Sequence, residues 1–310
     1  MQKRLSIGVD IGGTHITCAA VRIREGQLIK GTISRSLYNH ESTASVILES
    51  WAIAMNNTLS KIDTAQLAGI GFAIPGPFDY QNGTSKMQHK FKKLYDLHIP
   101  SALYPLLSCS RATPMRFLND ATCFAIGEAW LGQGKGMERL VGITLGTGFG
   151  SAFIEKGVPV VAGDRVPQNG CLWDLPFREG IADDYFSTRW FTNEYQKRTG
   201  EKISGVQELM EKTALNVHSR DLFEEFGQNL AACIAVPLQK FGAEVLVIGG
   251  NIANTLPAFE KTFREGLNGA GVVVKITSSK LMENAALIGS ARLLDDAFWD
   301  KVSLRLPGIQ

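Results

Sequence analysis

The stretch from Phe117 to Gly136 contains the residue best placed for acid–base chemistry. A short apolar run ends at Asn119-Asp120, and a helical pattern rich in small residues follows it until the glycines that begin at Gly132. Asp120 is therefore expected where a strand meets the N-terminus of a helix, a position whose local field favours a carboxylate and whose sheet edge binds ligands. Such a carboxylate could act as a general base, or it could simply cap the helix.

Three glycine-rich turns follow strand-like segments, and the first of them could hold an anion. Their sequences are D-I-G-G-T after the first strand, L-G-T-G-F-G after the strand at 139–145, and I-G-G-N after the strand at 243–248. Glycine has no Cβ, so the backbone N–H groups of such turns can approach an anion closely. An ordinary hairpin turn is the alternative for the first of them. The turn residues are Gly12, Gly13, Thr14, Gly146, Thr147, Gly148, Gly249, Gly250 and Asn251.

The elements that must position these groups form a repeating pattern. A strand, a glycine turn and a second strand occur twice, about 135 residues apart, which predicts two related α/β domains facing each other across a central cleft. Helical periodicity extends over 43–60, 183–197, 219–241 and 283–298. Pro237 falls late in the third of these segments and should kink or end that helix.

Composition excludes several classes of protein. The chain has 310 residues, 45% of them hydrophobic, which is enough for two domains with large cores. A net charge of +2 is too small to indicate a nucleic-acid surface. The five cysteines are scattered without a C-x-x-C pair, and no apolar run reaches the length of about 18 residues that spans a bilayer. We therefore expect a cytoplasmic protein that binds neither nucleic acid nor membrane.

The order and spacing of the motifs resemble the actin-like ATPase superfamily, which pairs two ribonuclease-H-like domains. Within it, the chain resembles the ROK family of sugar kinases (repressor, open reading frame, kinase). The segments that carry the resemblance extend from residue 8 to about 290; they are G-V-D-I-G-G-T-H, A-I-P-G-P, L-N-D-A, L-G-T-G-F-G and F-G-A-E-V-L-V-I-G-G-N-I. It implies an N-terminal lobe of residues 1–119, completed by a C-terminal helix within 286–310, and a C-terminal lobe of residues 120–285.

The resemblance also implies a function and a role for each motif. The chain would use ATP and Mg²⁺ to phosphorylate a hydroxyl of a hexose or an amino sugar, as glucokinases do in carbohydrate metabolism, and would form a homodimer. Asp120 would be the general base, while Asn119 and Gly76 of the A-I-P-G-P loop would contact the sugar. Asp10 would orient Mg²⁺ through water. The first two glycine turns would bind the ATP phosphates, and Gly249-Gly250-Asn251 would lie against the adenosine.

The chain departs from the family pattern between residues 162 and 187. Characterised members carry a Gly-Glu-x-Gly-His step there, followed by a cysteine-rich zinc motif that closes on Leu-Glu. This segment contains one cysteine, Cys171, and no histidine, so a four-ligand zinc site cannot be built locally and we expect no structural zinc. Asp174 could stand in for the family's histidine, and Asp183 for the Leu-Glu carboxylate, so the resemblance makes both candidate sugar-binding residues.

The sugar-binding part of the pattern is altered as well. The asparagine that family members place after the Pro-Gly-Pro loop is missing, and Met87-Gln-His-Lys90 occupies its neighbourhood. The identity of the sugar therefore stays open. The lysines of this stretch (Lys90, Lys92 and Lys93) are expected on a solvated face, although they would also suit a substrate that carries phosphate.

Two other functions stay open. The first is a non-catalytic sugar sensor built on the same fold. ROK repressors carry an N-terminal helix-turn-helix, and a first strand that starts by Leu5 argues against such a module, but not against a sensor that acts through a protein partner. The second is an ATPase of the superfamily that does not act on sugar. The retained Asp120 and the two phosphate turns favour a kinase.

Overall fold

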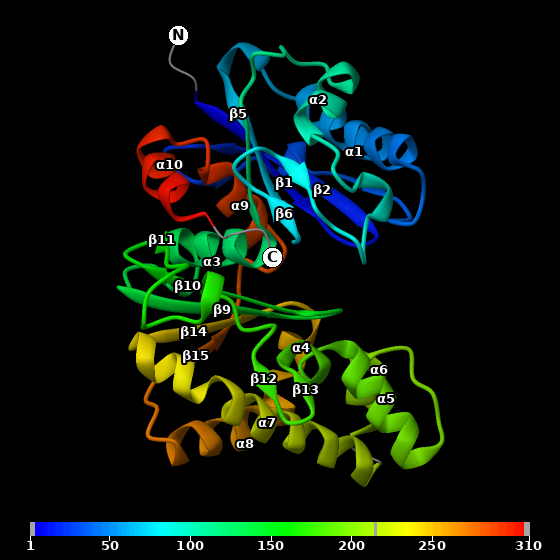
Figure 1. Cartoon of the computed structure of the whole chain (residues 1–310), viewed down its shortest axis with the longest axis vertical. Coiled ribbons are helices and arrows are strands. Elements are labelled where there is room, and N and C mark those ends of the chain that lie inside the picture. Colours follow the sequence, from blue (N-terminus) through cyan, green and yellow to red (C-terminus); the bar gives the residue numbers. More distant parts are fainter. Residues whose placement is uncertain (1–3, 214–215, 307–310) are drawn as a thin grey trace. The chain divides into compact units, whose positions relative to one another are not determined.

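The computed structural model describes residues 4–213 and 216–306, which form two compact units of mixed α/β structure (Figure 1). Unit 1 comprises Met1–Gly132, Gly157–Pro159 and Glu283–Gln310, and unit 2 comprises Gln133–Lys156 and Val160–Met282. This division places residues 120–132 in unit 1, whereas the sequence analysis assigned them to the C-terminal lobe. The two-residue strand β11 (Val158–Pro159) lies in the short segment that belongs to unit 1.

A six-stranded sheet forms the centre of unit 1. Its strand order is β3-β2-β1-β5-β8, and β4 also pairs with β2. Strand β1 is antiparallel to β2 and parallel to β5, which is in turn parallel to β8. The strands are β1 (Leu5–Ile11), β2 (His15–Arg22), β3 (Gln27–Leu28), β4 (Ser34–Leu37), β5 (Leu67–Ile74) and β8 (Met115–Asn119). A separate small hairpin, β6 (Phe78–Asp79) with β7 (Thr84–Ser85), follows β5.

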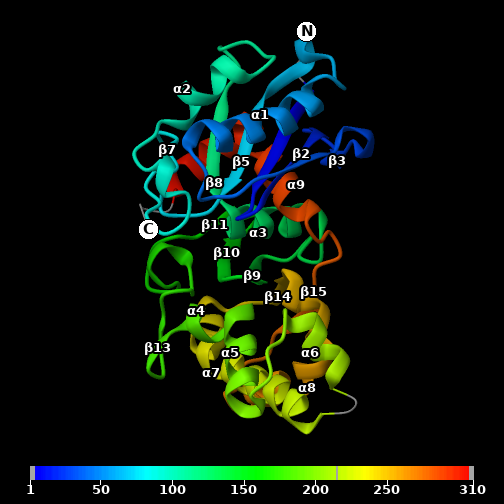
Figure 2. The ribbon, with the colours of Figure 1, turned by 90° about the vertical axis from the view of Figure 1, so that its right-hand side faces the viewer.

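Helices cover both faces of this sheet (Figures 1 and 2). Helix α1 (Ala44–Leu59) packs on one face with its buried residues Ile47, Trp51 and Met55. Helix α9 (Asn284–Arg292) crosses the other face beside α3 (Asp120–Leu131). Glycine permits this close approach, because a Cβ at Gly8 would lie 1.9 Å from the carbonyl oxygen of Leu287. The short helix α2 (Ile99–Leu103) completes the α1 side.

The C-terminal segment of unit 1 contains two helices where the sequence pattern predicted one over 283–298. Helix α9 ends at Arg292, and α10 (Asp296–Val302) begins after a turn. Asp295 is the N-cap of α10: its Oδ1 accepts from the backbone N–H of Phe298 at 3.3 Å. The backbone of Asp295 is extended (φ −78°, ψ 111°), which interrupts the helix, so the single-helix prediction was wrong.

The sheet of unit 2 has the same core pattern as that of unit 1. Its strands lie in the order β10-β9-β14-β15, with β9 antiparallel to β10 and parallel to β14, which is parallel to β15. The strands are β9 (Arg139–Leu145), β10 (Phe149–Glu155), β14 (Val245–Gly249) and β15 (Lys275–Ser278). An antiparallel hairpin followed by two parallel strands thus occurs in both units, as the repeated strand–turn–strand motif predicted.

Helices of unit 2 pack on its sheet through a large aromatic core that includes Phe186, Phe226 and Phe259. Helix α7 continues past Pro237 to Phe241, so the predicted early end does not occur. The helices are α4 (Ala182–Tyr185), α5 (Thr188–Thr199), α6 (Val206–Lys212), α7 (Val217–Phe241) and α8 (Leu256–Gly269). A short hairpin of β12 (Pro176–Phe177) and β13 (Gly180–Ile181) precedes α4.

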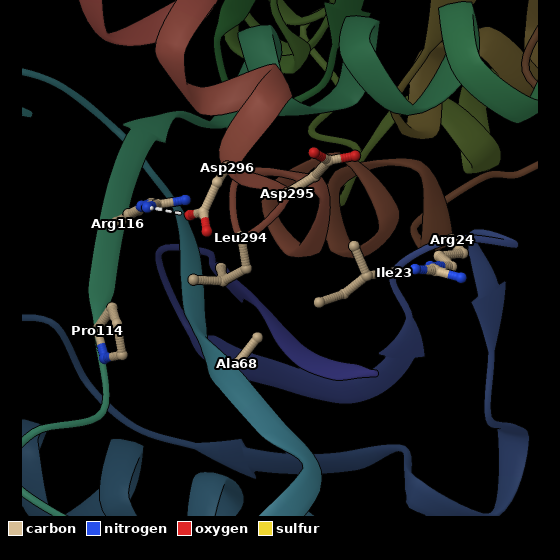
Figure 3. Close-up of a pocket in the computed structure, with 8 residues that line it drawn as sticks. All are labelled: Ile23, Arg24, Ala68, Pro114, Arg116, Leu294, Asp295 and Asp296. Atoms are coloured by element: carbon tan, nitrogen blue, oxygen red, sulfur yellow. Dashed lines mark hydrogen bonds and ion pairs between the residues drawn. The ribbon is translucent and has the colours of Figure 1, made fainter. Parts of the chain in front are cut away.

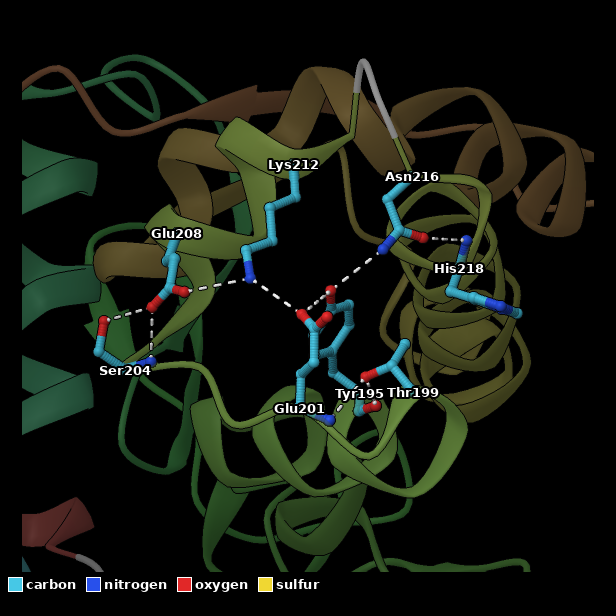
Figure 4. A network of polar contacts seen from close by, with 8 residues as sticks. All are labelled: Tyr195, Thr199, Glu201, Ser204, Glu208, Lys212, Asn216 and His218. Atoms are coloured by element: carbon cyan, nitrogen blue, oxygen red, sulfur yellow. Dashed lines mark hydrogen bonds and ion pairs between the residues drawn. The ribbon is translucent and has the colours of Figure 1, made fainter.

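A polar network ties α5, α6 and the start of α7 together (Figure 4). The ammonium of Lys212 lies 3.4 Å from carboxylate oxygens of both Glu201 and Glu208, and 5.4 Å from the ring centre of Tyr195. The Tyr195 hydroxyl also accepts from Nδ2 of Asn216 at 3.1 Å.

None of the helices in the described part of the chain combines the length and apolar composition that a bilayer span needs.

Candidate functional site

Asn119 and Asp120 lie where β8 ends and α3 begins. Oδ1 of Asn119 accepts from the backbone N–H of Thr122 at 3.1 Å and from its hydroxyl at 3.3 Å, so Asn119 is the N-cap of the helix. The cap interpretation considered for Asp120 is therefore wrong, since the preceding residue fills that role. Oδ1 of Asp120 instead accepts from the N–H of Ala121 at 2.8 Å and from Nδ2 of Asn119 at 3.0 Å. Neither of these donors uses Oδ2.

Sheet register places the other unit 1 candidates at the same edge. Asp10 pairs with Ala73 on the neighbouring strand β5, and Ile74, which ends β5, pairs with Asn119. The loop that contains Gly76 starts at the end of β5. Because β1, β5 and β8 are parallel, their carboxyl ends bring Asp10, Gly76 and Asn119-Asp120 to one edge, as expected for a ligand site in an α/β sheet.

Two of these carboxylates perturb each other. Burial, followed by the charges of Asp120 and Glu283, raises the pKa of Asp10 to about 7. Burial likewise raises the pKa of Asp120, while the N–H of Ala121 and the charge of Lys90 lower it. The site therefore holds more carboxylate charge than its own surroundings stabilise at neutral pH. Among the residues that the structure describes, no three His, Cys, Asp or Glu side chains gather closely enough to hold a metal ion directly.

The first glycine turn is held by Tyr38, which the sequence analysis missed. Within the turn, the N–H of Gly12 donates to the carbonyl of His15 at 2.9 Å. The Tyr38 hydroxyl donates to the carbonyl of Gly12, and the Tyr38 N–H donates to the carbonyl of Thr14 at 3.0 Å. In the described structure no hydrogen bond uses the N–H of Gly13 or Thr14, so both are available to an anion.

Lys90 belongs to a basic loop that is anchored beside this turn. The next residue, Phe91, is fully buried, and its ring centre lies 5.9 Å from that of Tyr38. Lys90, Lys92 and Lys93 are exposed, as expected for a solvated face. Lys86 pairs with Asp96 at 2.5 Å, whereas Lys90 is the cation whose charge acts on Asp120.

The second glycine turn joins β9 to β10 in unit 2. The N–H of Gly146 donates to the carbonyl of Gly148 at 3.1 Å. Directly after the turn, the N–H of Phe149 donates to Oδ1 of Asp183 at 2.6 Å. Thr147 is exposed. Within the described residues, no hydrogen bond takes the N–H of Thr147 or Gly148. Like the first turn, this turn therefore presents two consecutive backbone N–H groups that are available to an anion.

The third turn lies next to the second in the sheet of unit 2. Gly249 ends β14 and pairs with Thr144 near the end of β9. Gly250 has a φ of 82°, and a Cβ there would lie 2.2 Å from the carbonyl oxygen of Leu145, so only glycine fits. Asn251 is exposed and begins a 3-10 helix (Asn251–Thr255).

The two acidic residues proposed from the altered segment occupy different surroundings. Asp174 is exposed, and its Oδ1 lies 3.9 Å from Sγ of Cys171. Asp183, in contrast, contacts the second glycine turn, and its Oδ2 pairs with Arg189 at 3.3 Å. The structure thus groups Asp183 with the phosphate-turn candidates and leaves Asp174 at the surface beside the cysteine.

A cavity of about 460 Å³ in unit 1 lies away from these groups (Figure 3). It forms where β5 and β8 begin, whereas Asp10 and Asp120 lie where the parallel strands end. One wall is closed by Arg116, which donates to Asp296 at 2.7 Å. The residues that line it are Ile23, Arg24, Ala68, Pro114, Arg116, Leu294, Asp295 and Asp296. The cavity is therefore separate from the candidate catalytic groups.

Comparison with known proteins gives a consistent family match. The model of the ROK family matches residues 6–297. A glucokinase of Thermotoga maritima is 25% identical over 324 residues, covering 96% of this chain and 99% of that protein. An N-acetyl-D-glucosamine kinase of Pectobacterium carotovorum is 27% identical over 271 residues, covering 80% and 84%.

A solved structure shows the same fold. The ROK family glucokinase of Streptomyces griseus, crystallised with glucose and AMPPNP, superposes with a TM-score of 0.74 at 22% identity, covering 94% of this chain and 99% of that one. The matches confirm the predicted α/β fold of the actin-like ATPase type and the resemblance on which it was based.

Proposed function

The chain belongs to the ROK family, and from that premise we propose that it transfers the γ-phosphate of ATP to a hydroxyl group of a sugar. One observation supports this proposal most directly: Asp120 stands at the carboxyl edge of the sheet with one oxygen held by two donors and the other taken by neither. A carboxylate fixed in this way is suited to accept the proton of an attacking hydroxyl.

Each unit contributes groups that suit phosphoryl transfer. In unit 1, Asp120 is the proposed base, Asn119 and Gly76 contact the sugar, and the N–H groups of Gly13 and Thr14 bind phosphate oxygens. In unit 2, the N–H groups of Thr147 and Gly148 bind phosphate, and Gly249-Gly250-Asn251 lies against the adenosine. Catalysis of this kind depends mainly on positioning and on charge stabilisation, which turns with free amides provide.

The unit 1 carboxylates also fit a magnesium ion. Asp10 has a raised pKa because it is buried and because the charges of Asp120 and Glu283 lie nearby, and a nearby dication would relieve that repulsion. Asp10 would hold Mg²⁺ through water, and the bound ion would neutralise charge on the transferred phosphoryl group. Asp120 and Asn119 keep their roles toward the sugar hydroxyl.

The proposed acceptor is a hexose or an amino sugar, since relatives of this chain are named glucokinase and N-acetyl-D-glucosamine kinase. A broad panel of sugars is needed, because Met87-Gln-His-Lys90 occupies the neighbourhood where family members place a sugar-contacting asparagine. A cytoplasmic homodimer completes the proposal; light scattering of the purified protein measures its mass directly.

The function is tested by ADP release from MgATP against a panel of hexoses, amino sugars and N-acetylated sugars. The proposal requires ADP formation that depends on one class of sugar, with one equivalent of sugar phosphate for each ADP. ADP formation that no sugar stimulates would indicate an ATPase. Sugar binding by calorimetry without ADP formation, at any combination of sugar and nucleotide, would indicate a non-catalytic sensor.

A further inference from the structure

The segment from Cys171 to Arg189 is bonded to both ends of the second glycine turn. The carbonyl of Gly146 accepts from the N–H of Thr188 at 2.7 Å and from the Thr188 hydroxyl at 2.9 Å. On the far side of the turn, Oδ1 of Asp183 accepts from the N–H of Phe149 at 2.6 Å. The peptide groups that flank Thr147 and Gly148 are therefore both fixed by side chains from one short segment.

A further hydrogen bond joins the same segment to the hairpin of β9 and β10. The N–H of Leu172 donates to the hydroxyl of Ser151 on β10 at 2.7 Å. The segment is also closed on itself, because the N–H of Asp183 donates to the carbonyl of Trp173 at 2.9 Å. Asp183 is thus held by its main chain while its carboxylate holds the turn.

We propose that Asp183 and Thr188 are positioning residues that hold the Gly146–Gly148 turn in the shape that receives the phosphates of ATP. This inference rests on the proposed function and assigns Asp183 a role different from the sugar contact considered for it in the sequence. The free N–H of Thr147 belongs to the anchored Gly146–Thr147 peptide group, and the free N–H of Gly148 lies between this group and the anchored Gly148–Phe149 peptide group. Both therefore keep their direction before the nucleotide arrives. Donors that are fixed in advance bind an anion without a reorganisation cost.

Arg189, which also pairs with Asp184, partly offsets the charge of Asp183 and so reduces its repulsion of a nearby phosphate. Oδ2 of Asp183 lies 3.3 Å from the guanidinium of Arg189, and Oδ1 already accepts the Phe149 N–H. Glycine at position 148 leaves room for this arrangement, since a Cβ there would lie 3.0 Å from Oδ1 of Asp183 and would require the carboxylate to shift. The carboxylate thus acts on the turn backbone.

The experiment compares Asp183→Ala and Thr188→Val with two matched controls. Asp184→Asn alters the neighbouring carboxylate, which also pairs with Arg189 but bonds the N–H of Ile181 instead of the turn. Thr192→Val removes an exposed hydroxyl of the same helix as Thr188, bonded to the carbonyl of Arg189. Calorimetry with a non-hydrolysable ATP analogue and, separately, with sugar gives the two affinities for each variant.

Loss of one hydrogen bond to a charged group predicts about tenfold weaker nucleotide binding for Asp183→Ala. Thr188→Val keeps its N–H bond and should lose about threefold. Sugar affinity should change less than about twofold in both, and the controls should match the wild type. Asp183→Asn retains an acceptor and should recover part of the loss. Amide exchange provides a readout without ligand, since the N–H of Phe149 should exchange faster in Asp183→Ala.

Several results would overturn the inference. Weaker sugar binding with unchanged nucleotide binding in Asp183→Ala would make Asp183 a sugar ligand. Equal nucleotide affinity in folded Asp183→Ala, folded Thr188→Val and wild type would remove the positioning role. A wild-type chain that binds the ATP analogue but phosphorylates no sugar would refute the proposed function alone, because the same titrations would still test the turn.

Discussion

Nδ2 of Asn119 donates to Oδ1 of Asp120 at 3.0 Å, while Oδ1 of Asn119 caps helix α3 through the N–H of Thr122. The amide group of Asn119 is thereby fixed by the helix and transmits that orientation to the neighbouring carboxylate. The proposed base is therefore held by the same interaction that begins the helix, and its second oxygen is left for a substrate proton.

Asp120→Asn should lower kcat by about a hundredfold or more, which is the size of general-base effects. The amide can still accept from Ala121 and Asn119 through its oxygen, so the fold and the sugar affinity should be retained, but it takes no proton at neutral pH. Steady-state kinetics, sugar calorimetry and thermal unfolding test the three expectations together. A variant with near wild-type kcat would show that another group is the base.

Lys90→Gln should move the acid limb of the kcat/KM profile to higher pH. The charge of Lys90 lowers the pKa of Asp120, so its removal raises that pKa and leaves less of the base ionised on the acid side of the profile. The plateau at higher pH should be unchanged, and added salt should reduce the difference between the variant and the wild type. Lys93→Gln, in the same loop, is the control. A shift of equal size in both variants would attribute the effect to net charge.

Asp10→Asn should stabilise the protein in metal-free buffer at pH 8. A carboxyl whose pKa rises to about 7 on folding binds more protons in the folded state, so stability is lost as pH rises from about 4 through 7. Because the side chain is partly solvated, we expect a gain of about 2 kcal/mol at pH 8 and none below pH 4. Urea unfolding at pH 4, 6 and 8 measures this window.

Magnesium supplies the control for that experiment. A dication bound near Asp10 should stabilise the wild type at pH 8 and have less effect on Asp10→Asn. Lower stability of the variant at pH 8 without metal would mean that the Asp10 carboxylate makes interactions that outweigh its burial and its repulsion by Asp120 and Glu283.

The parts of the site that the sequence predicted are those encoded locally. Strands that end in glycine or in Asn-Asp are recognisable because a few adjacent residues determine both the turn and its chemistry. The repeated strand–turn–strand motif likewise predicted the shared topology of the two sheets. The division of the last helix depended on the capping geometry of Asp295, which a hydrophobic pattern does not contain.

The parts that the sequence did not predict depend on contacts between distant segments. Tyr38 holds the carbonyl of Gly12 from 26 residues away, and Thr188 holds that of Gly146 from 42 residues away. Both are common residue types without a motif of their own, so only the folded chain brings them to the turns. Asn119 and Asp120 are adjacent, yet which of them caps the helix is decided by backbone geometry.

Gly148→Val should weaken ATP binding by more than about tenfold while sugar binding changes little. A Cβ at this position would lie 3.0 Å from Oδ1 of Asp183, and a branched side chain would cover the free amides of the turn. Separate titrations with nucleotide and sugar measure the two effects. Gly31→Ala is a suitable control because nothing lies within 4 Å of a Cβ there. Equal loss of both affinities would point to general misfolding.

The purified chain should contain no stoichiometric zinc, because other interactions hold the segment where family members bind the metal. Sγ of Cys171 donates to the carbonyl of Gln168 at 3.4 Å, and the N–H of Ala182 donates to the carbonyl of Leu175 at 2.9 Å. The ring of Phe177 packs against aromatic neighbours, its centre 5.1 Å from that of Tyr185. These contacts close the segment without a ligand set, since a single thiol cannot build a tetrahedral site.

Elemental analysis of protein purified without added metal, together with thermal unfolding before and after chelation, tests this expectation. The zinc content should stay well below one atom per chain, and chelation should leave the Tm unchanged, because a structural zinc ion would contribute directly to folding free energy. Cys171→Ser should preserve the fold with only the modest loss expected for a buried polar substitution. One zinc atom per chain, with a Tm that falls on chelation and in Cys171→Ser, would show that residues outside 162–187 complete a metal site around this thiol.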